Sequence, residues 1–154
     1  MGPITILHGD TGVGKQGSGT FGSRSQAVAG TALHLAGAKV KAKMAKFAAA
    51  LLEAHEDDLV FENGMISVKG SPASGKSFAS VAGFAYVPVP LPAGLEPGLS
   101  DEAFFEPNNN TYPFGCHISM LEIDRHTGEP TLLKRVAVAD AGNLSNPLLV
   151  EGRI

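Results

Sequence analysis

The sequence contains one cysteine, no long apolar run and no excess of positive charge. A single cysteine excludes an internal disulfide framework and fits a reducing compartment, so we expect a cytoplasmic location. The net charge of −3 gives no reason to expect binding to nucleic acid. Because no stretch of about twenty consecutive apolar residues occurs, the sequence predicts no membrane span.

Residues for metal binding or nucleophilic catalysis are also scarce. The five histidines are scattered, and none has a second histidine or cysteine at the spacing of a zinc site. Adjacent residues on a strand point to opposite faces, so Cys116 and His117 cannot act as a nucleophile and its base. We therefore predict no catalytic residue and no metal ligand in this chain, and we expect Cys116 to be buried and inert.

The chain has 154 residues, which is enough for one globular domain with a modest core. Nineteen glycines and ten prolines predict much irregular backbone. We expect a single domain over residues 1–154, with a proline-rich connection at residues 87–100 laid over its surface.

Residues 26–55 repeat apolar side chains at spacings of three and four, which predicts one long helix. The expected apolar stripe consists of Leu33, Ala36, Val40, Met44, Phe47 and Leu51. Gly30 and Gly37 interrupt the helix, and we interpret them as points of close packing against a neighbouring element. A row of lysines lies off the stripe, namely Lys39, Lys43 and Lys46. This row is either a solvated face or the docking surface of a non-catalytic assembly piece.

Asn63 and Gly64, between two short apolar runs, predict a β-hairpin. We expect further strands at residues 4–7, 102–105, 115–123 and 132–139, and a short helix at residues 78–86. The strand at residues 115–123 carries apolar residues on both faces, so it is expected to be central in its sheet. The predicted fold class is α+β, with one long and one short helix packed on a mainly antiparallel mixed sheet.

Residues 70–77 read GSPASGKS and match the phosphate-binding P-loop pattern letter for letter. In such a site Lys76 would bind the terminal phosphates and Ser77 would bind Mg²⁺, so a nucleotide-triphosphate-binding module is an alternative function. Three features argue against it. The helix predicted after the motif, at residues 78–86, is short and is followed by prolines. Residues 66–69 alternate as a half-exposed hairpin strand does, and Pro72 removes one N–H donor from the cradle.

The stretch that points most clearly to a function runs from Gly9 to Ser25 and is rich in glycine, serine and threonine. A loop of this length in a compact domain usually has a function. Its glycines let backbone N–H groups approach a ligand closely. Arg24 offers a guanidinium fork for phosphate oxygens, and the helix that follows presents its positive N-terminus. The loop therefore favours an anion, and the alternative is a solvated linker that ends in a serine N-cap.

Several segments together resemble a known family. They are Gly9–Thr11 (GDT), Gly17–Ser25 (GSGTFGSRS), Pro113–His117 (PFGCH), Thr127–Glu129 (TGE) and Asn146–Gly152 (NPLLVEG). In this order, and over essentially the whole chain, they are similar to the molybdopterin-binding large subunit of the xanthine dehydrogenase, aldehyde oxidase and aerobic carbon monoxide dehydrogenase family. Two positions depart from the family pattern: Gly12 stands where aspartate is frequent, and Arg153 stands where glutamine is usual.

The resemblance implies that the loop wraps the pyrophosphate and dinucleotide part of a molybdopterin cofactor. The implied form is molybdopterin cytosine dinucleotide, whose own sulfurs hold the molybdenum. The implied cofactor-binding residues are Thr20, Phe21, Gly22, Ser23, Arg24, Ser25, Asp140, Ala141 and Asn146. In the family, the segment that contains the last three lies against the nucleotide end of the cofactor.

The resemblance also implies a fragment. The family's large subunit is several times longer, and its active-site loop and catalytic glutamate lie outside the stretch that this chain resembles. We therefore expect an internal piece of a molybdenum hydroxylase that hydroxylates aldehydes or N-heterocycles or oxidises carbon monoxide, inactive as this chain alone. The implied partners are the remainder of the large subunit and iron–sulfur and FAD subunits or domains.

Overall fold

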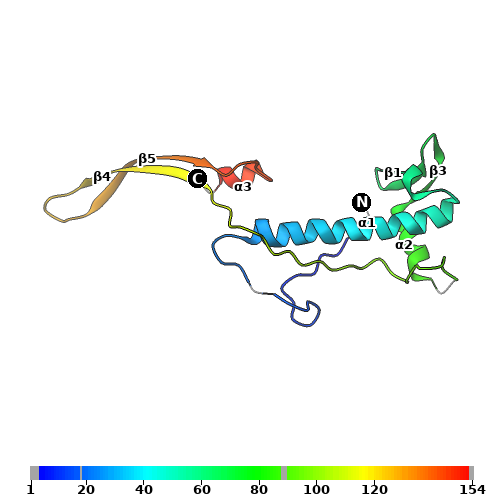
Figure 1. Cartoon of the computed structure of the whole chain (residues 1–154). Coiled ribbons are helices and arrows are strands. Elements are labelled where there is room, and N and C mark those ends of the chain that lie inside the picture. Colours follow the sequence, from blue (N-terminus) through cyan, green and yellow to red (C-terminus); the bar gives the residue numbers. More distant parts are fainter. Residues whose placement is uncertain (1–3, 18, 88–89, 153–154) are drawn as a thin grey trace. The chain divides into compact units, whose positions relative to one another are not determined.

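The computed structural model describes residues 4–17, 19–87 and 90–152 (Figure 1). The chain divides into two compact units, Met1–Pro107 and Asn108–Ile154. The expectation of one domain over the whole chain stays a prediction. Of the proline-rich connection, residues 88–89 lie outside the described residues, and the rest belongs to the first unit. Within the described ranges, no helix combines the length and apolar character that a membrane crossing requires.

The long helix of the first unit begins with a π-helical turn, η1 (Gln26–Gly30), and continues as α1 (Thr31–Leu52). The predicted long helix is therefore confirmed. It ends because Glu53 adopts a left-handed φ of 50°, which turns the chain away from the helix axis. A short 3₁₀ turn, η2 (Glu56–Asp58), then leads into the first sheet.

The first sheet contains β1 (Leu59–Glu62), β2 (Met65–Val68) and β3 (Ser71–Ser77), which are antiparallel and adjacent in that order. Asn63 and Gly64 join β1 to β2 with φ angles of 49° and 76°. Both residues are left-handed, as a type I′ turn requires, so the predicted hairpin is confirmed. The predicted short helix is also confirmed as α2 (Phe78–Tyr86), which follows β3 directly.

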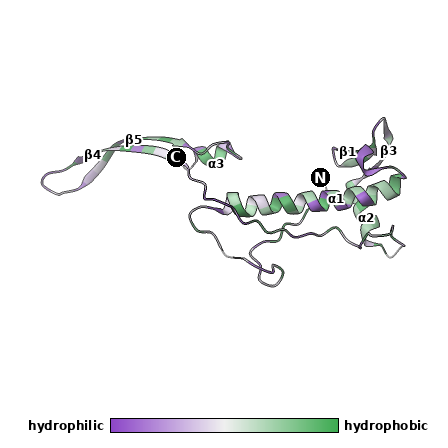
Figure 2. Cartoon of the chain, viewed as in Figure 1, coloured by the Kyte–Doolittle hydropathy of each residue, from purple (hydrophilic) through white to green (hydrophobic). Residues whose placement is uncertain are grey.

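The core of the first unit lies where the C-terminal half of α1 meets α2 and β2. Its fully buried side chains are Phe47, Ala48, Ile66, Val81 and Ala85. Phe47 packs edge to face on Phe84, with ring centroids 6.1 Å apart. Leu33, near the start of α1, is 46% exposed. The predicted apolar stripe is thus buried along the C-terminal half only, although hydrophobic residues occur all along α1 (Figure 2).

The two glycines of the helix do not serve close packing within this chain. A Cβ placed on Gly37 meets no atom of the described residues within 4 Å. The nearest atoms to a Cβ on Gly30 belong to the side chain of Gln26, 3.5 Å away in the same helix. The interpretation of these glycines as contact points with a neighbouring element is therefore wrong within the part of the chain that the structure describes.

Two predicted strands, at residues 4–7 and 102–105, are irregular in the structure. A strand needs a neighbour to complete its hydrogen-bond ladder, and no described strand pairs with either segment. Individual hydrogen bonds to α2, rather than a β-ladder, hold the chain that follows this helix. The Gly98 N–H donates to a carbonyl in α2 over 2.7 Å, and the Leu99 N–H donates to the Tyr86 hydroxyl over 3.1 Å.

The second unit contains β4 (Phe114–Ile123), β5 (Pro130–Asp140) and a short helix, α3 (Pro147–Glu151). The two strands pair antiparallel, with Ile118 opposite Val136, and the register shifts after Met120, where β5 carries one extra residue. The sequence predicted one sheet that contains both the hairpin and these strands. In the structure, β4 and β5 instead form a separate sheet. The α+β class itself is confirmed, because helices and antiparallel sheets make up the fold.

The prediction that residues 115–123 form a central strand is wrong for the described chain. β4 has β5 as its one described neighbour, and every residue of β4 is exposed. Cys116 is therefore exposed as well, contrary to the expectation that it is buried.

Asp124 organises the turn between β4 and β5. Its Oδ1 accepts hydrogen bonds from the N–H groups of His126, over 2.7 Å, and Thr127, over 3.0 Å. The Gly128 N–H donates to the Asp124 carbonyl over 2.8 Å, and Gly128 supplies the left-handed φ of 75° that closes the turn. Backbone donation from Thr127 and then His126 favours the ionised carboxylate, so the pKa of Asp124 is lowered.

Replacing Phe47 with alanine should destabilise the first unit by about 3–5 kcal/mol, because loss of a fully buried ring leaves a cavity beside Phe84. Phe104→Ala is the matched control. Its ring is 55% exposed, so the free energy of unfolding should fall by about 1 kcal/mol or less. Urea unfolding followed by far-UV circular dichroism measures both values, and equal losses would contradict the packing described.

The Asp124 turn should weaken in acid. Its stabilisation is fully present above the ordinary aspartate pKa of about 3.9 and is lost as the pH falls through the lower folded value. In an NMR titration, the amide shifts of His126 and Thr127 should therefore change with a midpoint below that of the urea-unfolded chain. Asp124→Asn should abolish this transition. A folded midpoint at or above the unfolded one would count against the assigned hydrogen bonds.

Candidate functional site

The candidate loop, residues 9–25, belongs to the first unit and leads into η1 and α1 (Figure 1). Asp10 shapes its first half. The Asp10 carboxylate accepts from the Gly12 N–H over 2.8 Å, and the Asp10 carbonyl accepts from the N–H groups of Val13, over 3.2 Å, and Gly14, over 2.8 Å. These bonds close a compact turn, so the glycine-rich stretch has a defined conformation there.

The second half of the loop is closed on itself. The hydroxyl groups of Thr20 and Ser25 share a hydrogen bond that links the two ends of this six-residue stretch. Between them, Gly22 and Ser23 both adopt left-handed φ angles, 61° and 56°. The left-handed region costs a residue other than glycine of order 1 kcal/mol or more. Backbone strain of this kind persists only where the surrounding structure enforces the conformation, often at ligand-binding sites.

Arg24 lies against Phe21 within this closed stretch. The guanidinium carbon is 5.4 Å from the centroid of the ring, which is the geometry of a cation–π contact. The Phe21 ring is 67% exposed, and Arg24 is partly buried. The ring thus contacts the partly buried guanidinium next to the first turn of the helix.

The helix starts directly after Arg24, whose carbonyl accepts from the Val28 N–H over 2.9 Å. Ser25 is already helical, with φ −56° and ψ −43°, and its side chain makes no capping bond to a described residue. The expected serine N-cap is therefore wrong, whereas a solvated linker without such a cap stays an alternative to the anion-binding loop. The first turn is π-helical, a rare conformation that often occurs at functional sites. No feature of the sequence predicted it.

The other predicted site residues lie in the second unit. Oδ1 of Asp140, at the end of β5, accepts from the Gly142 N–H over 2.9 Å. Oδ1 of Asn146 accepts from the Leu149 N–H over 3.3 Å and caps α3. Ala141 lies between them in an exposed turn. The structure thus brings Thr20, Phe21, Arg24 and Ser25 together in one unit, and these three residues in the other.

The P-loop match is not a phosphate cradle, because residues 71–77 form β3. Lys76 pairs with Ile66 of β2 in the ladder. A Cβ on Gly75 would lie 3.1 Å from the Ile66 carbonyl oxygen, so glycine is needed there for close approach of the two strands. The Ser77 hydroxyl accepts from the Ser80 N–H over 3.1 Å and caps α2. The strand and the cap account for the motif's glycine and serine.

Two of the lysines of α1 bind the chain's own backbone or carboxylates. Lys39 donates to the Glu102 carbonyl over 2.8 Å and lies 3.4 Å from the Asp101 carboxylate. Lys43 donates to the Pro97 carbonyl over 3.4 Å. These contacts tie the segment after α2 along the helix. Lys39 and Lys43 therefore help to hold the first unit together, which disfavours the docking-piece alternative.

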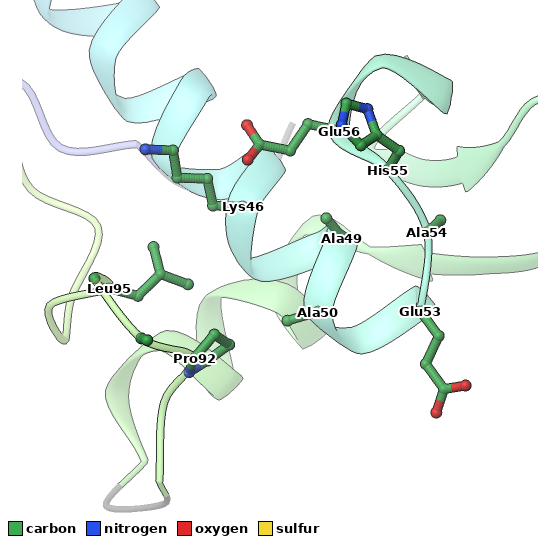
Figure 3. A pocket seen from close by; sticks show the side chains of 11 residues that line it. Lys46, Ala49, Ala50, Glu53, Ala54, His55, Glu56, Pro92 and Leu95 are labelled. Carbon is green, nitrogen blue, oxygen red and sulfur yellow. The ribbon is translucent and has the colours of Figure 1, made fainter.

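A surface hollow of about 740 Å³ lies at the far end of α1 (Figure 3). The helix end contributes Ala49 and Ala50, and Pro92 and Leu95 lie opposite. A helix of 22 residues spans about 33 Å, so the hollow is remote from the Arg24 end of the helix. Nowhere in the described ranges do three or more histidine, cysteine or acidic side chains gather to hold a metal ion.

Comparison with known proteins gives consistent matches over the chain. The family model described as "Molybdopterin cofactor-binding domain" matches residues 1–154. The carbon monoxide dehydrogenase large chain of Hydrogenophaga pseudoflava is 44% identical over 151 residues, which cover 98% of this chain and 19% of that protein. The nicotine 6-hydroxylase large subunit of Paenarthrobacter nicotinovorans is 36% identical over 152 residues, which cover 98% and 19%.

A solved structure shares the fold. The crystal structure of a Cu,Mo-CO dehydrogenase in its carbon monoxide reduced state matches with a TM-score of 0.77 and 39% identity, covering 93% of this chain and 18% of that one. The chain thus spans about a fifth of the length of the relatives it matches.

We expect Mg–ATP not to bind this chain, because residues 71–77 are committed to a β-ladder and a helix cap. Isothermal titration calorimetry should show no heat of binding, and Lys76→Ala should leave the titration unchanged. Micromolar binding that disappears in Lys76→Ala would contradict this prediction and restore the nucleotide-triphosphate alternative.

Proposed function

The chain belongs to the molybdopterin cofactor-binding domain family, and on this premise we propose that residues 20–25 bind the pyrophosphate of the cofactor. The observation that carries the proposal is the closed stretch from Thr20 to Ser25. It combines two left-handed residues, a hydroxyl pair and the guanidinium of Arg24 at the start of a helix. The chain would thereby form part of the cofactor-binding subunit of a molybdenum hydroxylase.

The chemistry of this stretch fits a phosphate group. Its side chains comprise one cation, three hydroxyl groups, one aromatic ring and no carboxylate. A guanidinium can donate two parallel hydrogen bonds to neighbouring oxygens, and left-handed residues next to a helix start expose successive N–H groups. The helix N-terminus adds a favourable potential for negative charge. Arg24 and these backbone donors would therefore position the pyrophosphate, with Phe21 orienting the guanidinium.

We assign Asp140, Ala141 and Asn146 to the nucleotide end of the cofactor. The carboxylate of Asp140 accepts the Gly142 N–H through Oδ1, and a carboxylate has about four acceptor positions in all. A carboxylate oxygen accepts from the amino group of cytosine, so these residues are compatible with the cytosine dinucleotide form. The local turn and the α3 cap would hold these oxygens in place.

The bound cofactor supplies the redox chemistry, either hydroxylation of a carbon with oxygen from water or oxidation of carbon monoxide. This chain contributes binding and orientation, and we propose that it has no turnover alone. Its partners in the proposed enzyme are the remainder of the large subunit and iron–sulfur and FAD subunits or domains, in the cytoplasm. The names of the relatives include both carbon monoxide dehydrogenase and nicotine 6-hydroxylase, and we propose that residues outside this chain select the substrate.

Arg24→Ala in the full-length large subunit should lower cofactor occupancy by about one to two orders of magnitude, because a hydrogen bond to a charged group contributes roughly 1.5–3 kcal/mol. Arg24→Lys should recover part of the occupancy, since an ammonium group cannot bind two oxygens in the same fork. The measurements are molybdenum per subunit and cytidine monophosphate released by hydrolysis.

Lys15→Ala is the matched control for this experiment. It removes a cation from the same loop, but Lys15 pairs with Glu102 over 3.2 Å and lies outside residues 20–25. Its cofactor content should stay normal. Normal molybdenum and cytidine content in Arg24→Ala would overturn the assignment and leave Arg24 with a structural role at the helix start.

A further inference from the structure

One face of the β4–β5 ribbon is apolar and has no cover within the second unit. The apolar face consists of Phe114, Cys116, Ile118 and Met120 of β4 and of Val136 and Val138 of β5. It is bounded on the same side by Asp140, opposite Phe114, and by Lys134, opposite Met120. The ladder places Cys116 opposite Val138 and Ile118 opposite Val136, so the side chains are contiguous. The five apart from Cys116 are between 44% and 76% exposed. Contiguous apolar surface of this kind marks an interaction site.

The opposite face of the ribbon is polar at its centre and carries the apolar side chains of Leu121 and Ile123 toward the turn. His117 and Ser119 alternate with the apolar residues of β4, and Arg135 lies opposite Ser119 on β5. The Arg135 guanidinium lies 3.1 Å from Nδ1 of His117, so the two side chains bond across the strands. In its central part the ribbon thus has one apolar and one polar face, as an antiparallel sheet does when it packs on one side and faces water on the other.

A ribbon of two strands is at best marginally stable in water without a packed face. We propose that the apolar face docks on an apolar surface of the same large subunit, contributed by chain outside these 154 residues. This inference rests on the proposal that the chain functions within such a subunit. The curated relatives are about five times longer than the stretch they share with it, so such a surface has ample chain to come from.

The size of the face disfavours a second copy of this chain as the occupant. β4 has ten residues, so one face of the ribbon measures about 34 Å by about 10 Å. Two copies stacked on this face would bury about 700 Å² in total, below the roughly 1,000 Å² of a specific interface between separate chains. A surface in the same polypeptide needs less area, because the covalent link makes the local concentration high.

Cys116 reports directly on the cover, because it lies within the apolar face and is the chain's single cysteine. In the isolated chain it should react with iodoacetamide as fast as in the urea-unfolded chain at the same pH. In the full-length large subunit, peptide mass spectrometry should show labelling slowed by about two orders of magnitude or more, because labelling then requires local opening.

Ser119→Cys is the matched control on the polar face of the same strand. In the full-length subunit, this thiol should remain reactive while Cys116 is protected. Fast labelling of Cys116 in the full-length subunit would overturn the proposal, and equal protection of both positions would overturn its one-sided form. Concentration-dependent protection in the isolated chain, with dimers in sedimentation, would instead assign the face to a second copy.

The result is separable from the fate of the cofactor site. Molybdenum content is measured on the same preparations. A protected Cys116 in subunits whose cofactor content is unaffected by Arg24→Ala would retain the docking face and discard the loop assignment. If Cys116 is accessible and Arg24→Ala lowers the cofactor content, the loop assignment is retained and the docking face is discarded.

Discussion

The first unit depends on the burial of Phe47 in one cluster with Ile66 and Val81. This contact fixes the C-terminal half of α1 against α2 and β2, while the N-terminal half of the helix has no buried side chain. The helix therefore acts as a rigid arm, anchored at one end, that presents residues 20–25 at the other. Lys39 and Lys43, in the middle of the helix, also hydrogen-bond to the segment after α2 and so stabilise its position.

Local features of the fold could be predicted from the sequence, and features that depend on distant partners could not. Asn63 and Gly64 specify their turn because both positions need left-handed backbone, and the spacing of apolar residues specifies α1. Residues 4–7 have the composition of a strand, but a strand also needs a neighbouring ladder. The same dependence on a partner explains why residues 115–123 look like a central strand in sequence and are exposed in the structure.

The candidate site divides in the same way. Its composition indicated an anion-binding loop, and the guanidinium and hydroxyl groups were visible as residue types. Three features of the site could not be predicted: the contact of Arg24 with Phe21, the left-handed Ser23 and the π-helical turn. Each depends on the backbone conformation, and loops of similar composition can adopt other conformations. The P-loop match shows the converse: its lysine, glycine and serine are all present, and the backbone that would give them a nucleotide role is a strand.

The π-helical turn at Gln26–Gly30 has a consequence for the direction of the loop. A π-helical turn accommodates one residue more than a turn of α-helix, and one residue corresponds to about 100° of rotation around an α-helix. Phe21 and Arg24 therefore face a different side of α1 from the one that regular winding would give them. Deleting one residue from this turn would make the helix more regular and swing the loop around its axis. An uninterrupted α-helix would therefore direct Arg24 to another side of the helix axis.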